Sequence, residues 1–198
     1  MSDHDLLKQK ADSDFHFLKS LINLSKLNNW RIVVSGGYGM DFFLNELTRY
    51  HGDLDIIIYG KESRKDVTIK LNEFIDGYFS KPEIIIKPQG FYLEFDVKDK
   101  GFIANIYFVE TVEDPKINLK KIRKINGEII VNKISEFPMP VPGEIDGFKL
   151  EVQDQNAHLA DILKRRGYDK SLTKHDSDIL RLSKITDPKK VEFLVNQK

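Results

Sequence analysis

The sequence predicts an α+β protein, in which a mixed β-sheet core is flanked by helices and followed by a helical C-terminal tail. Two apolar runs of strand length, residues 31–34 and 53–59, each lie beside a segment with helical spacing of apolar residues. Residues 91–97 and 102–109 alternate around Lys98-Asp99-Lys100-Gly101, a pattern typical of a β-hairpin. Strands are concentrated early and helices late, which favours the α+β class.

The first elements follow from the spacing of apolar residues and from the residues that interrupt it. Residues 5–28 have helical spacing, which Asn28-Asn29 ends, and residues 31–34 then form a short buried strand. A tight turn is expected at Ser35-Gly36-Gly37, and a helix over residues 39–47.

The central strand is marked by three consecutive isoleucines within residues 53–59, because strands buried on both faces have continuous apolar runs. An amphipathic helix is expected over residues 63–77, and a strand over residues 83–87 after Pro82.

Four prolines predict irregular chain between residues 111 and 149, with a short strand at Ile129–Val131. Helices are expected over residues 151–166 and 175–196, separated by Gly167-Tyr168.

Length and composition exclude several classes of protein. The 198 residues suffice for one domain with a small appendage, which we divide into a core at residues 1–135 and a linker with a helical segment at residues 136–198. Lys+Arg and Asp+Glu both number 31, and this neutral balance makes a nucleic-acid partner unexpected. The chain has no cysteine, so disulfides, thiolate metal sites and cysteine nucleophiles are excluded. Without a long apolar run or an apolar leader, a cytoplasmic protein with no membrane segment is expected.

Two features near the start of the chain point to phosphate chemistry. Gly36-Gly37 lies between a strand and a helix, where backbone amides can approach an anion, although such turns are common and this one alone is a weak signal. It lacks the lysine of a Walker loop and the third glycine of a dinucleotide-binding turn. Arg49 offers a guanidinium that binds phosphate in bidentate fashion, the alternative being a surface arginine.

The third feature is the pair Asp53 and Asp55. Positions two apart on a strand point the same way, so both carboxylates leave one face and repel each other unless a cation lies between them. Mg²⁺ prefers such oxygen ligands. The alternative is that both aspartates lie at the solvent-exposed start of a strand. The isoleucines that follow argue against this alternative, because they place the pair at the entrance of a buried strand. The three features together suit phosphoryl or nucleotidyl transfer.

These motifs resemble the nucleotidyltransferase superfamily, and within it the small lincosamide and aminoglycoside nucleotidyltransferases. The resemblance is carried by residues 35–41 (SGGYGMD) and 49–56 (RYHGDLDI). Residues 167–169 (GYD) and 174–179 (KHDSDI) are similar to a second family segment, with His175 where an aspartate is usual. The resemblance implies a nucleotidyltransferase-like fold whose catalytic core is the segment 1–135.

The resemblance also implies the roles of individual residues. Ser35, Gly36, Gly37 and Arg49 would hold a nucleoside triphosphate, expected to be ATP, and Asp53 and Asp55 would bind catalytic Mg²⁺. A further set would support the site or bind the acceptor: Asp41, Tyr168 and Asp178. Tyr107 could also flank the acceptor, although a cross-strand aromatic contact is the simpler explanation.

The sequence departs from the family at its third carboxylate, where Asn105 stands in the segment Asn105-Ile106-Tyr107. Asparagine can bind a metal weakly but cannot act as a base. In a hairpin centred on Asp99-Lys100, Glu94 would lie opposite Asn105 and Asp96 would be its diagonal neighbour, so either could replace the missing carboxylate. A solvent-side pair on an outer strand is equally compatible with the pattern.

The expected function is transfer of a nucleoside monophosphate to a hydroxyl of a small molecule, such as a lincosamide or aminoglycoside antibiotic. Two alternatives remain open. One is a catalytically weak nucleotide-binding protein, suggested by Asn105. The other is a toxin-type nucleotidyltransferase acting on protein or tRNA. A second subunit completes the acceptor cleft in many of these enzymes, so a homodimer is a further alternative.

Overall fold

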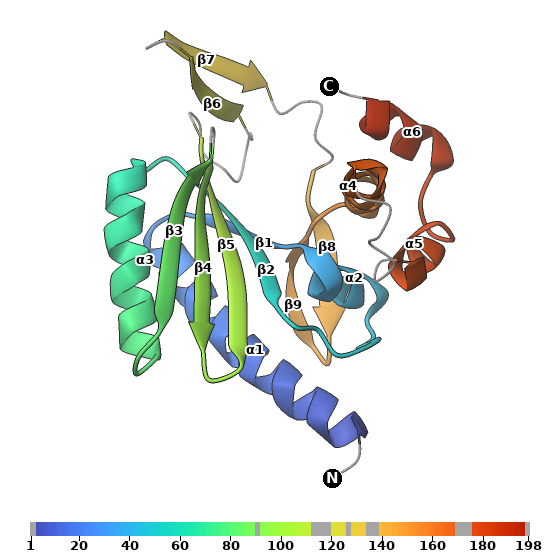
Figure 1. Cartoon of the computed structure of the whole chain (residues 1–198), viewed down its shortest axis with the longest axis horizontal. Coiled ribbons are helices and arrows are strands. Elements are labelled where there is room, and N and C mark those ends of the chain that lie inside the picture. Colours follow the sequence, from blue (N-terminus) through green and yellow to red (C-terminus); the bar gives the residue numbers. More distant parts are fainter. Residues whose placement is uncertain are drawn as a thin grey trace.

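The computed structural model describes residues 3–89, 92–111, 120–125, 128–133, 139–168 and 176–196. A seven-stranded mixed sheet has the order β3-β4-β5-β2-β1-β9-β8, and a separate two-stranded ribbon is formed by β6 and β7. Figure 1 shows the ribbon projecting beyond one end of the sheet. The strands are β1 (Arg31–Val34), β2 (Leu54–Gly60), β3 (Glu83–Gln89), β4 (Tyr92–Asp99), β5 (Phe102–Glu110), β6 (Lys120–Ile125), β7 (Glu128–Lys133), β8 (Val141–Ile145) and β9 (Phe148–Val152).

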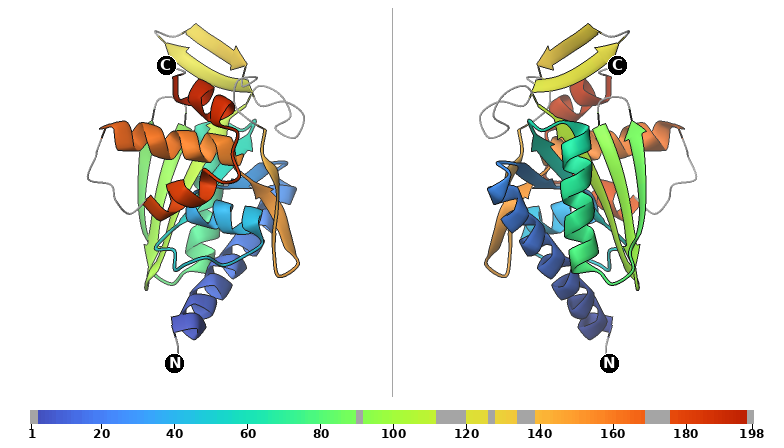
Figure 2. Two further views of the ribbon diagram at one scale, coloured as in Figure 1. Left: turned by 90° about the vertical axis from the view of Figure 1, so that its right-hand side faces the viewer. Right: turned by 90° about the vertical axis from the view of Figure 1, so that its left-hand side faces the viewer.

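Six helices within the described residues pack around the sheet, as the two views of Figure 2 show. One view has α1 and α3 in front, and the opposite view has α4, α5 and α6 in front. The helices are α1 (Asp3–Leu27), α2 (Gly36–Leu44), α3 (Arg64–Tyr78), α4 (Gln155–Tyr168), α5 (Asp176–Leu182) and α6 (Pro188–Asn196). The predicted α+β class with a mixed sheet is confirmed.

Strand alternation separates a core face of the sheet from a face that carries polar residues. Leu54, Ile56 and Ile58 of β2 are fully buried against α1 and α3, in one large cluster. The intervening Asp55 and Ile57 are half-buried on the other face. A second, smaller cluster joins α2 to the C-terminal helices.

The sheet includes a hairpin that the sequence did not predict. β8 and β9 pair in antiparallel fashion within residues 111–149 and just beyond, where irregular chain was predicted, so that prediction is wrong. Pro142 and Gly143 obscured the alternation, yet proline is tolerated in an edge strand such as β8. Because residues 148–152 are a strand, α4 begins at Gln155. The boundary at residue 135 stays a prediction, although strands from both sides of it share this sheet.

Two further element boundaries differ from the prediction. The helix after β1 begins directly at Gly36, because the two glycines form its first turn instead of preceding it. The C-terminal helical segment is divided at residues 183–187, because Pro188 begins a new helix.

The β4–β5 hairpin has a different register from the expected one. Lys100 and Gly101, both at positive φ (43° and 88°), form its two-residue loop. Asp96 therefore pairs with Asn105, and Glu94 pairs with Tyr107. The expectation that Glu94 lies opposite Asn105 is wrong by two residues, because the glycine takes the second loop position.

Candidate active site

The two aspartates converge on Asn105. Leu54, between them, points into the core, so the carboxylates of Asp53 and Asp55 project from the opposite face. The Asn105 Nδ2 group donates to Asp55 Oδ1 at 3.0 Å and to Asp53 Oδ2 at 3.3 Å. The parallel pairing of β2 with β5 produces this contact, because it places Asn105 directly beside Asp55. The predicted pairing of two acidic side chains on one face is confirmed.

The glycine turn lies against Asp55. Gly36 has φ +63°, and a Cβ atom added there would lie 2.2 Å from Asp55 Oδ2. The Ser35 amide also donates to the Asp55 carbonyl at 3.0 Å. Both the left-handed backbone and this close approach therefore require glycine at position 36.

The N-terminus of α2 is suited to an anion. Ser35 is its N-cap, but its side chain makes no capping hydrogen bond, and the first turn contains no acidic residue. The first amides of a helix carry partial positive charge and lack intrahelical partners. The turn therefore presents N–H donors beside Asp55.

Asp41 and His51 form a buried pair behind the turn. Both side chains are almost completely inaccessible, and His51 Nε2 lies 2.7 Å from Asp41 Oδ2. Asp41 also accepts hydrogen bonds from the backbone amide of Thr48, at 3.1 Å, and from the Thr48 hydroxyl. Asp41, assigned to substrate binding by resemblance, is enclosed in this structure and fixes the loop before Asp53.

His51 is a structural residue of the site, whose role the sequence did not decide. A Cβ atom on Gly37 would lie 2.1 Å from His51 Nδ1, so the imidazole packs directly on the turn. The ring also packs on Tyr38, with centroids 4.5 Å apart. Tyr38 donates to the buried Asp14 of α1 at 2.6 Å, and burial raises the pKa of its phenol far above the ordinary value. The motif contained His51, but only tertiary contacts show what it supports.

Removing the Asp41 carboxylate should destabilise the fold. Asp41→Ala leaves three donors around it without their acceptor, and each unsatisfied buried group costs about 1–3 kcal/mol. We expect the free energy of unfolding in urea to fall by about 3 kcal/mol. Glu192→Ala, an exposed change on α6, should alter it by less than about 0.5 kcal/mol. Equal effects of the two substitutions would contradict the supporting role of Asp41.

Arg49 lies in the loop between α2 and β2 and is ion-paired with Asp178 of α5. Arg49 Nη2 donates to Asp178 Oδ2 at 3.0 Å, and Nη1 donates to the Tyr50 carbonyl at 3.1 Å. The structure thus brings together a residue expected to bind phosphate and one expected to bind the acceptor. Tyr168 ends α4, and its side chain lies outside the described residues.

The outer strands continue the polar face beyond Asn105. Lys87 of β3 is hydrogen-bonded to Asp96 and lies 3.7 Å from Glu94 Oε1. The hydrogen bond to Asp96 raises the pKa of the Lys87 ammonium, so Lys87 remains a cation at neutral pH. Tyr107 is half-buried on the same face.

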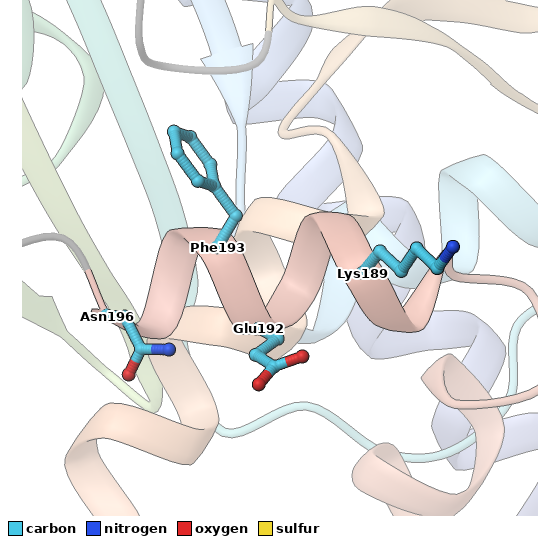
Figure 3. A pocket seen from close by; sticks show the side chains of 4 residues that line it. All are labelled: Lys189, Glu192, Phe193 and Asn196. Atoms are coloured by element: carbon cyan, nitrogen blue, oxygen red, sulfur yellow. The ribbon is translucent and has the colours of Figure 1, made fainter.

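The chemistry of this donor set fits a cation held by two carboxylates. Within the described part of the chain, no three His, Cys, Asp or Glu side chains gather as a metal site, in keeping with an amide at position 105. A shallow hollow elsewhere, on the outer face of α6, is lined by Lys189, Glu192, Phe193 and Asn196 and contains none of these site residues (Figure 3).

Comparison with known proteins identifies the class of fold. Residues 17–85 match the family model for aminoglycoside-2''-adenylyltransferase. No curated protein matches the chain. The chain has the nucleotidyltransferase fold, and the resemblance predicted from residues 35–41 and 49–56 is confirmed.

Solved structures that it resembles include those of an antibiotic-resistance factor and of a lincosamide antibiotic adenylyltransferase. The crystal structure of ANT(2'')-Ia in complex with adenylyl-2''-tobramycin is 15% identical, with a TM-score of 0.63 over 92% of this chain and 95% of that one. The solution structure of the same antibiotic-resistance factor is 14% identical, with a TM-score of 0.62 over 93% and 90%. The lincomycin-bound lincosamide antibiotic adenylyltransferase LnuA is 19% identical, with a TM-score of 0.58 over 86% and 97%.

Proposed function

We propose that this protein is a nucleotidyltransferase that transfers a nucleoside monophosphate from a triphosphate, ATP in the first instance, to a hydroxyl of a small molecule. The observation that carries the proposal is the convergence of Asp53 and Asp55 on one point beside the N-terminus of α2. The names of the structural neighbours support it. Use of a nucleoside triphosphate agrees with a cytoplasmic location.

Asp53 and Asp55 would hold Mg²⁺, which when bound neutralises charge on the triphosphate. The Asn105 amide occupies the position between the carboxylates and stabilises them without metal. Rotation of that amide would turn its oxygen, in place of its N–H donors, toward the carboxylates. The Asn105 side chain could therefore hydrogen-bond the carboxylates without Mg²⁺ and offer an oxygen ligand with Mg²⁺ bound.

The triphosphate would lie over the start of α2. The backbone amides of Gly36 and Gly37 and the Ser35 hydroxyl would donate to phosphate oxygens, and Arg49 would add a charged donor. Acceptor and pyrophosphate occupy opposite sides of the reacting phosphorus in an in-line displacement. We therefore assign the acceptor to the β5–β4 side of the aspartates, where Tyr107 lies.

Asp96 is a better candidate than Glu94 for the general base. It is the direct cross-strand neighbour of Asn105, whereas Glu94 is opposite Tyr107. Both carboxylates are paired with the ammonium of Lys87. An ionised carboxylate on this side can accept the proton of the acceptor hydroxyl.

Two substitutions distinguish these carboxylates. General-base catalysis contributes about 100- to 10,000-fold, so Asp96→Asn should lower kcat by at least 100-fold. Glu94→Gln, with the same loss of charge beside Lys87, should lower kcat by less than about 10-fold. The measurement is pyrophosphate release at saturating ATP. A larger loss of kcat in Glu94→Gln than in Asp96→Asn would indicate that Glu94 is the general base.

The alternative of a catalytically weak nucleotide-binding protein is favoured by one observation, the neutral amide of Asn105 between the two acids. Asn105→Asp tests it. If activity appears only in that variant, the native site is a binding site with little turnover. Robust native turnover that falls in Asn105→Asp would exclude this alternative.

The acceptor proposed here is an antibiotic of the aminoglycoside or lincosamide class. Pyrophosphate release from ATP and Mg²⁺ should be screened with tobramycin, lincomycin and other polyhydroxyl compounds. Nucleotide binding without any antibiotic turnover would reject this acceptor class and retain the proposed reaction. Absence of Mg²⁺-dependent nucleotide binding would reject the reaction itself.

A further inference from the structure

Asp178, assigned by resemblance to the acceptor side, contacts the residue expected to hold phosphate. Its two carboxylate oxygens face one edge of the Arg49 guanidinium, at 3.0 Å from Nη2 and 3.4 Å from Nε. The two residues are 129 positions apart in the chain. Arg49 lies in the loop between α2 and β2, whereas Asp178 lies on α5.

Burial indicates which member of this pair a ligand can reach. The Arg49 side chain is 40% exposed, whereas that of Asp178 is only 5% exposed. One turn further along α5, Leu182 is fully buried in the cluster that joins the C-terminal helices to α2. Asp178 is therefore part of a packed helix, and Arg49 lies between it and solvent.

The guanidinium is held on two sides. Its Nε and Nη2 atoms face Asp178, and Nη1 donates to the Tyr50 carbonyl. A guanidinium has five N–H donors, so one donor on each terminal nitrogen has no partner among the residues that the structure describes. Such a fork matches phosphate oxygens, and fixing it in advance lowers the entropy lost on binding.

We propose that Asp178 is a positioning residue that orients Arg49 toward the triphosphate, so that α5 completes the nucleotide site and not the acceptor site. This inference rests on the proposed function, in which Arg49 binds phosphate. Asp178 itself touches no substrate in this arrangement.

Asp178→Asn tests the inference without any knowledge of the acceptor. The probe is a non-hydrolysable ATP analogue with Mg²⁺, titrated calorimetrically. Partners that orient metal ligands contribute about 10- to 100-fold to affinity, and by analogy we expect loss of the Asp178 carboxylate to lower nucleotide affinity by about 10-fold. Glu192→Gln, the same chemical change on the exposed face of α6 (Figure 3), should leave affinity unchanged. Unaltered affinity in a folded Asp178→Asn protein overturns the inference.

A double-substitution cycle separates positioning from general damage. In an Arg49→Ala background, Asp178→Asn should weaken binding no further, because Asp178 acts through Arg49. Additive losses would overturn the inference.

Arg49→Lys covers the case in which Asp178→Asn does not fold. It keeps a cation against Asp178 but lacks the planar fork, and should also lose about 10-fold; unchanged affinity would again overturn the inference. If the native protein binds no nucleotide, the proposed function is wrong. If the native protein binds nucleotide and the substitutions have no effect, only the proposed role of Asp178 is wrong.

Discussion

Asp55→Asn is expected to abolish Mg²⁺-dependent nucleotide binding, with affinity reduced by at least about 100-fold. The substitution removes one of the two charges that converge beside Asn105, and leaves a cation that gives up its waters reluctantly with one anionic protein ligand in place of two. The fold should remain, because an asparagine can still accept the hydrogen bond from Asn105. Asp53→Asn should have the same effect.

Calorimetric titration of the ATP analogue, with and without Mg²⁺, measures this loss. Asp146→Asn is the matched control, because Asp146 lies exposed in the β8–β9 turn at φ +48°, a conformation that asparagine also adopts. Nucleotide binding that persists in Asp55→Asn with its magnesium dependence intact would show that the metal lies elsewhere.

Gly36→Ala is expected to lower kcat/KM by at least about 100-fold. An alanine at φ +63° costs about 1–2 kcal/mol of backbone strain. Its methyl group would also stand 2.2 Å from Asp55 Oδ2, so the carboxylate must move away from its neighbours. A displacement of about 1 Å in such a group is enough to cost about 100-fold in rate.

Gly77→Ala provides the comparison for this glycine. A Cβ atom at position 77 meets nothing within 4 Å, and the residue lies within α3. Alanine should therefore stabilise that helix by up to about 1 kcal/mol and leave kcat/KM unchanged. Thermal unfolding and steady-state kinetics on both variants check the prediction. A fully active Gly36→Ala enzyme would refute the close approach between the turn and Asp55.

The site could be predicted where it depended on local geometry. Alternation along β2 is enough to place Asp53 and Asp55 on one side, because Leu54 and the isoleucines fix which face is buried. The contact with Asn105 is different in kind, since it depends on β2 and β5 being neighbours in a parallel pair. Family resemblance suggested that contact, and spacing alone could not.

The features that could not be predicted depended on long-range packing or on which residues form a hairpin loop. The hairpin sequence does not show which two residues form the loop, and a shift of one position moved the partner of Asn105 from Glu94 to Asp96. Nothing local to Arg49 indicates a partner on α5. The roles of Asp41 and His51 likewise required their burial to be known.

The position of β9 has a consequence for how the protein is made. Ribosomes release β1 and β2 early, yet one neighbour of β1 is a strand near residue 150, to which the buried Arg31 is joined by two 2.7 Å hydrogen bonds with Glu151. Until β9 has been synthesised, the backbone groups on one edge of β1 have no strand partner, just before the glycine turn. This edge of β1 is therefore completed only after β9 has been synthesised, and a chain truncated before β9 would leave the edge open to misassembly.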